Sequence, residues 1–317
     1  MKQTLTQELL FSLTAENPSI SPKFFYDEIG SHLFQVITLL EEYYPTRTEK
    51  WIMDTYQPEI RDAVGHCDVL LDLGAGNCAK ASRLFETINP KQYRALDISK
   101  EYLEIAVSDL QKQFPHIEMS AHTVDLSLPM TFPDVQESKG IFFYPGSSIG
   151  NFDPDSADQF FINIANECNG NGGLLIGVDL VKDVETLELA YNDPLGVTAA
   201  FNLNVLLNVN RLIGSNFNLA DWEHYTFFNT TDSRIEMHLR ALCDTKVSLP
   251  TEESRDHVIT FKAGDLIHTE NSYKYTQENF VEKLKRTGFS DIYCWTDPKN
   301  HFLVCFAKAR KSSSVNS

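Results

Sequence analysis

The sequence predicts an α/β protein built on a mostly parallel sheet, and two observations carry this prediction. Short apolar runs recur along the first part of the chain, with helix-compatible segments between them. The C-terminal part then ends in one helix and two strand-like runs. Alternation of strand and helix is typical of a parallel sheet that helices cover on both faces. The five expected parallel strands are 69–73, 93–96, 117–124, 140–144 and 173–178.

An antiparallel hairpin is predicted at the end of the chain. Residues 276–286 have a helical pattern, with Thr276 as the N-cap and Gly288 just past the last turn. The strand-like runs 291–295 and 302–307 follow, joined by residues of strong turn composition. Five parallel strands completed by such a hairpin resemble the class I methyltransferase fold, a Rossmann-like sheet.

Two segments do not fit that sheet. Residues 1–60 look mainly helical, and residues 183–272 are too long for a crossover loop. The second segment has helix-compatible text at 184–191 and 199–209, followed by strand-like text at 233–242 and 257–262. Because ligand sites favour domain interfaces, we interpret 1–60 and 183–272 as a smaller α+β substrate-binding domain. The sheet domain would then comprise 61–182 and 273–310, and 311–317 would be a disordered tail.

Composition limits the class of partner. A net charge of −17 and an isoelectric point near 4.9 argue against nucleic acid. Six scattered cysteines without a C-x-x-C pair are typical of reduced thiols in a cytoplasmic enzyme. No apolar run approaches a membrane span, the N-terminus does not resemble a signal peptide, and the nine histidines lack ligand spacing, so no metal is expected. We expect a cytoplasmic monomer that acts on a small molecule, with no membrane contact and no obligatory protein partner.

The most informative run is DVLLDLGAGN, residues 68–77. A buried strand, a glycine turn and a helix start are predicted here, and such a turn lets the backbone approach a ligand. The next strand-like run ends at Asp97, where a ribose-binding carboxylate would lie. The sequence therefore predicts a cofactor that contains a ribose.

The glycine turn alone fits NAD or FAD as well as S-adenosylmethionine (SAM), because residues 74–79 match G-x-G-x-x-A. Three features favour SAM: the acid Asp72 on the strand before the glycines, the acid Asp125 after the third strand, and the terminal hairpin. The alternative for Asp97 and Asp125 is that each only caps a turn. Their ordered occurrence on successive strands favours the cofactor hypothesis.

Eight further motifs run in order along nearly the whole chain. They resemble the histidine-specific Nα-methyltransferases of the ergothioneine pathway. The motifs are FYDEIGS (25–31), EYYPTRTE (42–49), GSSIGN (146–151), DLVKD (179–183), AYNDPLGVTAAFN (190–202), RIEM (234–237), TENS (269–272) and WTDP (295–298).

The resemblance implies a cofactor site for SAM with Asp97 on the ribose and Asp125 near the adenine. Leu126 and the run Asn77-Cys78-Ala79 depart from the family pattern, which bears on SAM affinity. The implied cofactor-binding residues are Gly74, Lys80, Asp97, Asp125 and Leu126.

The resemblance also implies an amino-acid site. The carboxylate and amino group of the bound amino acid would be held by Tyr43, Asn151, Tyr191 and the backbone at Gly146. Tyr26 would lie near the methylated nitrogen. The imidazole ring would be held by Glu270, Ser272 and Met237.

The chemistry of these residue types agrees with those roles. Tyrosine hydroxyls and an asparagine amide donate hydrogen bonds to a carboxylate without titrating near neutral pH. Glu270 accepts from an imidazole N–H, and Ser272 meets the other nitrogen as donor or acceptor. Two residues that are separated by one position face the same way on a strand.

Each residue also has a structural alternative. Tyr43 and Met237 would be core residues, Glu270 a solvated surface acid, and Asn151 a cap for the helix that starts near Asp153. Cys78 lies within the cofactor loop, where a catalytic nucleophile is one alternative. No histidine is matched to it, so we expect a small packing residue there.

The predicted reaction is transfer of the methyl group of SAM to the α-amino nitrogen of L-histidine, repeated to the trimethylated betaine hercynine. Tyr26 and a water held by Asn151 are the candidates for handling the proton. The rival readings are the same chemistry on another amino acid or related small amine, a catalytically silent SAM-binding module, and an enzyme that methylates protein or RNA.

Overall fold

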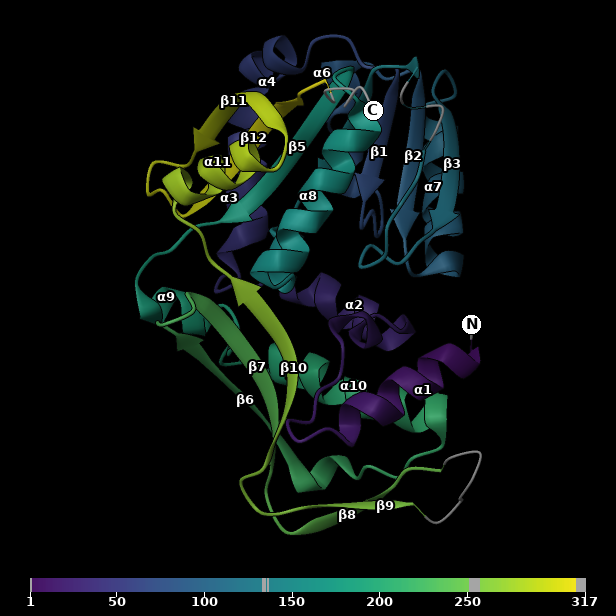
Figure 1. Cartoon of the computed structure of the whole chain (residues 1–317), viewed down its shortest axis with the longest axis vertical. Helices are drawn as coiled ribbons and strands as arrows, with labels where there is room; N and C mark the ends of the chain where they lie inside the picture. Colours follow the sequence, from purple (N-terminus) through teal and green to yellow (C-terminus); the bar gives the residue numbers. More distant parts are fainter. Residues whose placement is uncertain (1, 133–134, 136, 251–256, 312–317) are drawn as a thin grey trace, which may run out of the picture. The chain divides into compact units, whose positions relative to one another are not determined.

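A computed structural model describes residues 2–132, 135, 137–250 and 257–311, so the predicted tail at 311–317 lies outside the described residues except for Lys311. The chain divides into two compact units. We call Met1–Tyr44 with Lys182–Ser272 the insert unit, and Pro45–Val181 with Tyr273–Ser317 the core unit. Figure 1 follows the chain by colour through both units.

The core unit is built on a seven-stranded sheet of order β11-β12-β5-β4-β1-β2-β3. Strands β1 to β5 pair in parallel, whereas β12 is antiparallel to both β5 and β11. This order, with its terminal antiparallel hairpin, confirms the predicted Rossmann-like methyltransferase sheet. The strands are β1 Val69–Leu73, β2 Gln92–Asp97, β3 Glu118–Thr123, β4 Gly140–Tyr144, β5 Gly172–Asp179, β11 Phe289–Thr296 and β12 Phe302–Ala309.

Two hydrophobic clusters cover the two faces of this sheet. One packs α8 and α11 against Leu71, Phe142 and Ile176, and the other packs α3, α4 and α7 against Leu70 and Tyr93. The apolar periodicity of each helix therefore buries a single face. The helices are α3 Tyr44–Thr55, α4 Gln57–Val64, α5 Ala79–Ser82, α6 Phe85–Ile88, α7 Lys100–Gln113, α8 Pro154–Cys168 and α11 Gln277–Arg286, with the short η3 Ser148–Asn151.

The first boundary between the units differs from the prediction. Residues 45–60 were expected in the smaller domain, but they belong to the core unit. The reason is packing, because Ile52 of α3 and Ile60 of α4 are fully buried in the cluster that contains Leu70 and Tyr93. The helical pattern of this segment was visible in the sequence, whereas the surface that it covers was not.

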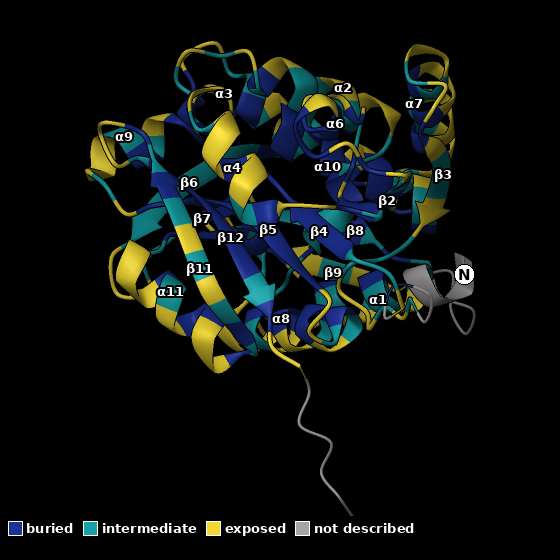
Figure 2. Ribbon diagram, turned by 90° about the horizontal axis from the view of Figure 1, so that it is seen from above, coloured by how far each residue is buried: buried dark blue, intermediate teal, exposed yellow. Residues whose placement is uncertain are grey.

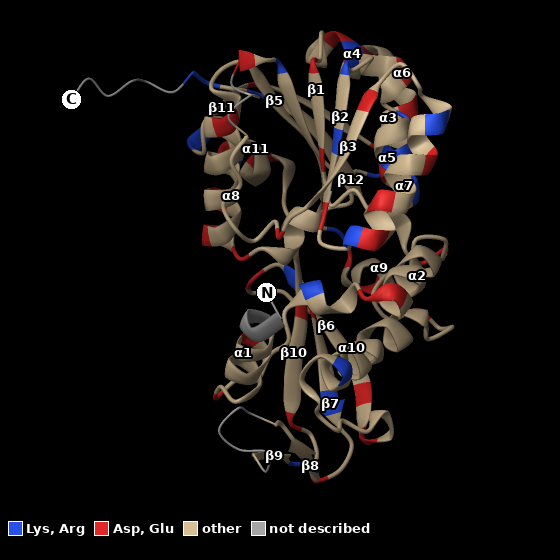
Figure 3. Cartoon of the chain, turned by 90° about the vertical axis from the view of Figure 1, so that its right-hand side faces the viewer, with Lys and Arg blue, Asp and Glu red and all other residues tan. Residues whose placement is uncertain are grey.

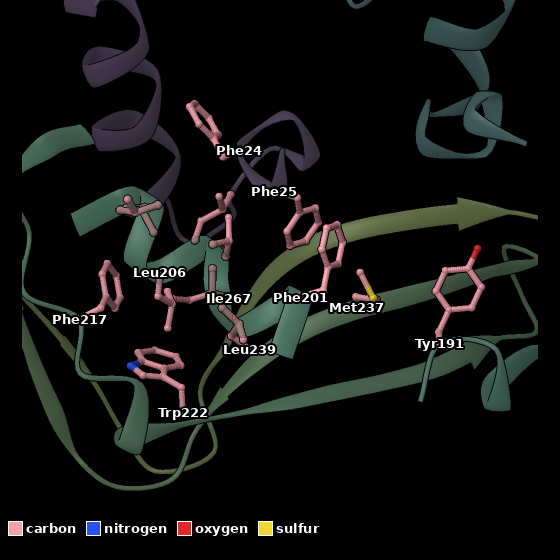
Figure 4. Packing of buried hydrophobic residues seen from close by; sticks show 14 of the residues in the cluster. Phe24, Phe25, Tyr191, Phe201, Leu206, Phe217, Trp222, Met237, Leu239 and Ile267 are labelled. Atoms are coloured by element: carbon pink, nitrogen blue, oxygen red, sulfur yellow. The ribbon is translucent and has the colours of Figure 1, made fainter. Parts of the chain in front are cut away.

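The insert unit packs helices on a three-stranded sheet of order β10-β7-β6, beside a separate β8-β9 pair. Figure 4 shows the core between α10 and this sheet, where Phe25, Phe201, Leu206, Met237 and Ile267 are buried together. The elements are α1 Lys2–Leu13, η1 Pro22–Phe25, α2 Glu28–Ile37, α9 Val184–Leu189, α10 Val197–Ile213, η4 Leu219–Asp221, β6 Trp222–Asn229, β7 Arg234–Ala241, β8 Thr245–Ser248, β9 Val258–Phe261 and β10 Leu266–Tyr273.

Buried asparagines of α10 hold the N-terminal segment of the insert unit. Asn204 donates to Oδ1 of Asp27 at 2.8 Å, and Asn208 donates to the carbonyl of Phe24 at 2.7 Å. Asp27 also caps α2 by accepting from the N–H of Gly30 at 2.8 Å. Buried polar groups need hydrogen-bond partners, and these bonds supply them. They hold the carbonyl of Phe24 and the carboxylate of Asp27, and so fix the position of Tyr26 between them.

Two global features bear on the class of partner. No helix in the described part of the chain is long and apolar enough to cross a membrane. In the view of Figure 3, lysines and arginines of each unit are scattered among acidic residues.

Candidate functional site

The glycine turn after β1 is folded onto the end of β2. The N–H groups of Gly74 and Ala75 donate to the carbonyl of Leu96 at 2.8 and 3.1 Å. Gly74 and Gly76 have φ angles of 70° and 52°, a left-handed conformation that glycine adopts without steric cost. The turn leads into α5, as the sequence predicted.

Asp97 and Asp125 follow neighbouring strands and lie at the same edge of the sheet. Asp97 accepts from the N–H of Gly76 at 2.9 Å and from that of Ser99 at 3.0 Å. Asp125 accepts from the N–H of Ser127 at 3.0 Å and from its hydroxyl at 2.5 Å. Both acids therefore make turn-capping bonds, and Asp97 is in addition bonded to the glycine turn.

Leu126 lies close to the first glycine of the turn. A Cβ placed on Gly74 would be 3.9 Å from Cδ1 of Leu126. The structure thus brings the glycine turn, both acids and Leu126 to one edge of the core-unit sheet.

Asp72 is buried on β1 behind the turn. The hydroxyl of Tyr93 donates to Oδ2 of Asp72 at 2.7 Å, and Oδ1 has no hydrogen-bond partner among the described residues. Burial raises the pKa of Asp72 to about 7. The acid that helped to predict SAM therefore holds a proton far more readily than an exposed aspartate does.

A second turn in the core unit carries Gly146 and Asn151. Gly146 and Ser147 have positive φ angles, and the Ser147 hydroxyl accepts from the N–H of Asp179 at 2.9 Å. The cap of α8 is Asp153, whose side chain accepts from Asp155 and Ser156. Asn151 is therefore not the helix cap that its structural alternative required.

In the insert unit, the structure brings together three predicted residues from separate segments. The hydroxyl of Tyr191 donates to Oγ of Ser272 at 2.7 Å. The rings of Tyr43 and Tyr191 meet edge to face, with centroids 6.3 Å apart. All three residues are buried. The hydroxyls of Tyr191 and Ser272 thus form a polar pair inside an apolar core, and the rings of Tyr43 and Tyr191 pack beside it.

Glu270, Met237 and Tyr26 also belong to the insert unit. Glu270 lies on β10 and is only 8% exposed, so it is not the solvated surface acid that its alternative required. Met237 is buried in the core beside Phe201, in agreement with its alternative as a core residue. Tyr26 packs edge to face on Phe34 and Phe201.

The described residues contain no group of three or more His, Cys, Asp or Glu side chains that is arranged to hold a metal ion. Around the glycine turn, the core unit presents backbone N–H groups and carboxylates. These donors and acceptors fit the hydroxyl, amino and carboxylate groups of a nucleoside linked to an amino acid.

Comparison with known proteins decides the family. Residues 5–309 match the family described as "Histidine-specific methyltransferase, SAM-dependent". The chain belongs to this family. The match confirms the resemblance that was stated from the motifs, and with it SAM as the cofactor in place of NAD or FAD.

Two curated relatives agree with the family. A histidine N-alpha-methyltransferase of Mycolicibacterium smegmatis is 37% identical over 96% of this chain and 95% of its own length. Ergothioneine biosynthesis protein 1 of Neurospora crassa is 30% identical over 92% of this chain and 33% of its own length. A solved SAM-dependent methyltransferase from Clostridium acetobutylicum is 14% identical, covers 90% of this chain and 99% of its own, and has a TM-score of 0.47. The fold assignment rests on the strand order of the core-unit sheet and not on this structural similarity.

Sequence reasoning did not single out Glu49, which joins two predicted site residues of this methyltransferase. Its Oε2 accepts from Lys80 Nζ at 2.7 Å, and its Oε1 accepts from the N–H of Gly146 at 2.7 Å. Glu49 is only 4% exposed. The side chain has room because β5 carries Gly177, where a methyl group would overlap with Oε1 of Glu49. The only sequence signal was its place in the EYYPTRTE motif.

His224 supports Tyr191 in the insert unit of the methyltransferase. Its Nε2 lies 2.9 Å from the carbonyl of Tyr191, and its Nδ1 lies 2.8 Å from the amide nitrogen of Asn202. These partners require a proton on Nε2 and a lone pair on Nδ1, which is the neutral ring. Burial lowers the pKa of His224, which favours the same form. A single histidine without a motif gave no sequence signal for this role.

Proposed function

We propose that this methyltransferase transfers the methyl group of SAM to the α-amino nitrogen of free L-histidine, repeatedly, to give the trimethylated product. The observation that supports it best is the buried polar group on β10. Glu270 and Ser272 lie two residues apart on a strand, and Ser272 is bonded to Tyr191. A buried carboxylate next to a buried hydroxyl matches the two ring nitrogens of an imidazole, one as a donor and the other as an acceptor or donor.

We assign the cofactor to the core unit. Asp97 would accept from the ribose hydroxyls, Asp125 with Leu126 would flank the adenine, and Gly74 would let the backbone approach SAM. Lys80 would bind the carboxylate of the methionine part, oriented by its ion pair with Glu49. Because Lys80 remains partly exposed on its other side, it can bind this carboxylate while it keeps Glu49.

We assign most of the amino-acid grip to the insert unit. Tyr43 and Tyr191 would donate to the substrate carboxylate. In the core unit, Gly146 and Asn151 are assigned separately to the amino acid, as the resemblance implies. The N–H of Gly146 is already bonded to Glu49, which leaves its carbonyl to accept from the substrate ammonium or amine. Met237 would pack on the imidazole ring, next to the bonds from Glu270 and Ser272.

The residues of the chain mainly position the reactants and remove a proton. Bound SAM supplies a methyl group on a positively charged sulfur, which an unprotonated nitrogen displaces in line. Tyr26 would border the reacting nitrogen, and its ring face would stabilise the growing cation as methyl groups accumulate. Asn151 would hold a water that accepts the proton. Positioning by fixed donors of this kind contributes roughly 7–11 kcal/mol to such reactions.

Transfer from radiolabelled SAM to a panel of free amino acids tests the proposal. The panel includes histidine, its mono- and dimethylated forms, tryptophan, phenylalanine, glutamine and a histidine whose ring is methylated. Histidine and its α-N-methylated forms should have the highest kcat/KM, and the ring-methylated histidine should react poorly, because a buried partner is left unpaired. Better turnover of any other amino acid would overturn the assignment of substrate.

We also propose that the chain works as a monomer in the cytoplasm, without an obligatory protein partner. The six cysteines without a C-x-x-C pair support a reducing compartment. Size-exclusion chromatography with light scattering on the active enzyme tests the oligomeric state. Activity that is confined to a dimer peak would contradict it.

A further inference from the structure

The terminal hairpin contains two cysteines that no step of methyl transfer uses. Cys294 on β11 and Cys305 on β12 are directly opposite each other in the antiparallel register. Their sulfur atoms are 3.1 Å apart. Directly opposite residues on antiparallel strands have Cα atoms about 4.5–5.5 Å apart, which lies within the range of about 4.4–6.8 Å that a disulfide spans. The backbone is thus already placed for an S–S bond.

We propose that Cys294 and Cys305 form a reversible cross-strand disulfide when the enzyme meets a hydroperoxide. The site is a pair and not a single reactive thiol. Each of the other four cysteines lacks such a cross-strand partner, since none of Cys67, Cys78, Cys168 and Cys243 lies within hydrogen-bond distance of another sulfur in the described residues.

The two thiols differ in a way that fits attack and resolution. Cys294 lies on β11, at the edge of the sheet, and is half-buried, whereas Cys305 is fully buried on β12. Figure 2 shows β11 banded by exposure, with β12 almost wholly buried beside it. The hydrogen bond with Cys305 lowers the pKa of the Cys294 thiol, whereas burial raises that of Cys305. A thiolate that solvent can reach is the form that attacks a peroxide.

The chemistry balances with a hydroperoxide as the oxidant. The thiolate of Cys294 attacks one peroxide oxygen, so an S–O bond forms, the O–O bond breaks, and hydroxide or alkoxide leaves. The sulfur of Cys305 then attacks the sulfenic sulfur, so the S–S bond forms and the S–O bond breaks. The departing hydroxide takes the proton of Cys305 and becomes water. With hydrogen peroxide the sum is two thiols and one peroxide giving one disulfide and two waters.

The disulfide would leave the proposed cofactor site intact. Cys305 and Cys294 pack with the cluster under α8 and α11, together with Leu303 and Ala307. Val304 packs in the cluster on the opposite face and pairs with Gly177, which makes room for Glu49. The bond would therefore connect the edge strand to its neighbour on the face that is not next to Glu49. Its effect should be on stability and not on methyl transfer.

The test oxidises the reduced full-length enzyme with one equivalent of hydrogen peroxide. Thiol titration in denaturant should find two thiols fewer than the six of the sequence, with monomer retained on non-reducing gels. Peptide mapping should find residues 294 and 305 linked, and dithiothreitol should restore all six thiols. The Tm of the oxidised enzyme should rise by about 2–5 °C, because the bond closes a short loop.

Matched variants make the result decisive. Cys294→Ser should lose no thiol pair after treatment with peroxide. Because residue 294 is only half-buried, we expect this variant to fold. Cys243→Ser removes an exposed cysteine and should still form the disulfide. Loss of thiols at Cys243 while residues 294 and 305 remain open to alkylation would overturn the proposal. A covalent dimer, or six unchanged thiols after peroxide, would overturn it as well.

Discussion

The residues assigned to the cofactor in the core unit differ in their physical chemistry from those assigned to the substrate in the insert unit. We call the first set the cofactor half and the second set the substrate half. The core unit presents charges and backbone groups around turns, with Asp97 in a turn cap and the half-exposed Lys80 in an ion pair with the buried Glu49. The insert unit presents hydroxyls and aromatic rings in a buried core, where Tyr191 bonds to Ser272. The difference indicates that the cofactor half depends on charged pairs and backbone groups, whereas the substrate half depends on single buried hydrogen bonds and on shape.

The largest expected effect tests the charge of the core unit. Because burial raises the pKa of Asp72 to about 7, the folded chain binds this proton more tightly than the unfolded chain does. The stability that the proton contributes is complete below about pH 4 and is lost as the pH rises through 7, by up to about 4 kcal/mol. Asp72→Asn mimics the protonated acid at every pH. Its free energy of unfolding relative to that of the wild type should therefore increase from about pH 5 to about pH 8.

Urea unfolding of both proteins at the two pH values measures this gain. The difference between them isolates Asp72, since their other titrating groups are the same. A difference in the free energy of unfolding that does not change with pH would show that Asp72 titrates like an exposed acid. The contrast between the units would then be weaker than proposed.

The next effect tests the buried acid of the insert unit. Glu270→Ala should lower kcat/KM for histidine by about 10–150-fold, because a buried charged hydrogen bond contributes about 1.5–3 kcal/mol. SAM binding, measured by calorimetry, should remain unchanged. Glu270→Gln keeps the shape and one acceptor, so its loss should be smaller. Equal SAM and histidine defects would indicate a general folding fault.

A smaller effect is expected in the cofactor half at Glu49. Glu49→Ala should raise the KM for SAM by about 10-fold, the cost of about 1.4 kcal/mol for a charged hydrogen bond that is lost. Glu49→Gln should recover most of it, since an amide oxygen still accepts from the N–H of Gly146. Gly177→Ala should reproduce the defect from the other side, because a methyl group there would displace Glu49.

These three variants are compared by steady-state kinetics with SAM varied at saturating histidine. Normal KM values in both Glu49→Ala and Gly177→Ala would show that Lys80 and the Gly146 turn need no help from Glu49. A defect in the KM for histidine alone would move Glu49 from the cofactor half to the substrate half.

The smallest effect tests a single hydroxyl. Tyr191→Phe removes the bond to Ser272 but keeps the edge-to-face contact with Tyr43, so kcat/KM for histidine should fall by about 5–10-fold. Ser272→Ala removes the other partner. If the two act through one bond, the double variant should be little worse than either single one. Additive losses would show that each hydroxyl binds its own part of the substrate.

Sequence patterns predicted the core unit better than the insert unit. The strand β1 and the turn at Gly74 have strong local signals, because a buried parallel strand is continuously apolar and a positive φ favours glycine. Strand β6, at residues 222–229, was not predicted, since its mixed aromatic and polar residues reflect an antiparallel sheet with one covered face.

The limits of sequence reasoning are clearest where long-range contacts decide a role. Asp97 caps a turn and also accepts from the glycine turn, so the cap does not remove it from the predicted cofactor site. Asn151 is not a cap, because Asp153 supplies that function. Glu49 could not be found, since its importance depends on residues 31 and 97 positions away in the chain. No local pattern encodes such a distance.

Gly177 carries a consequence for anyone who redesigns this enzyme. A strand at the centre of a sheet is usually improved by replacing glycine with a larger residue, which fills space and favours extended backbone. Here the space is already taken by the carboxylate of Glu49, so the stabilising exchange would expel a charge into the core. Position 177 and helix α3 must therefore be altered together, or neither can be altered.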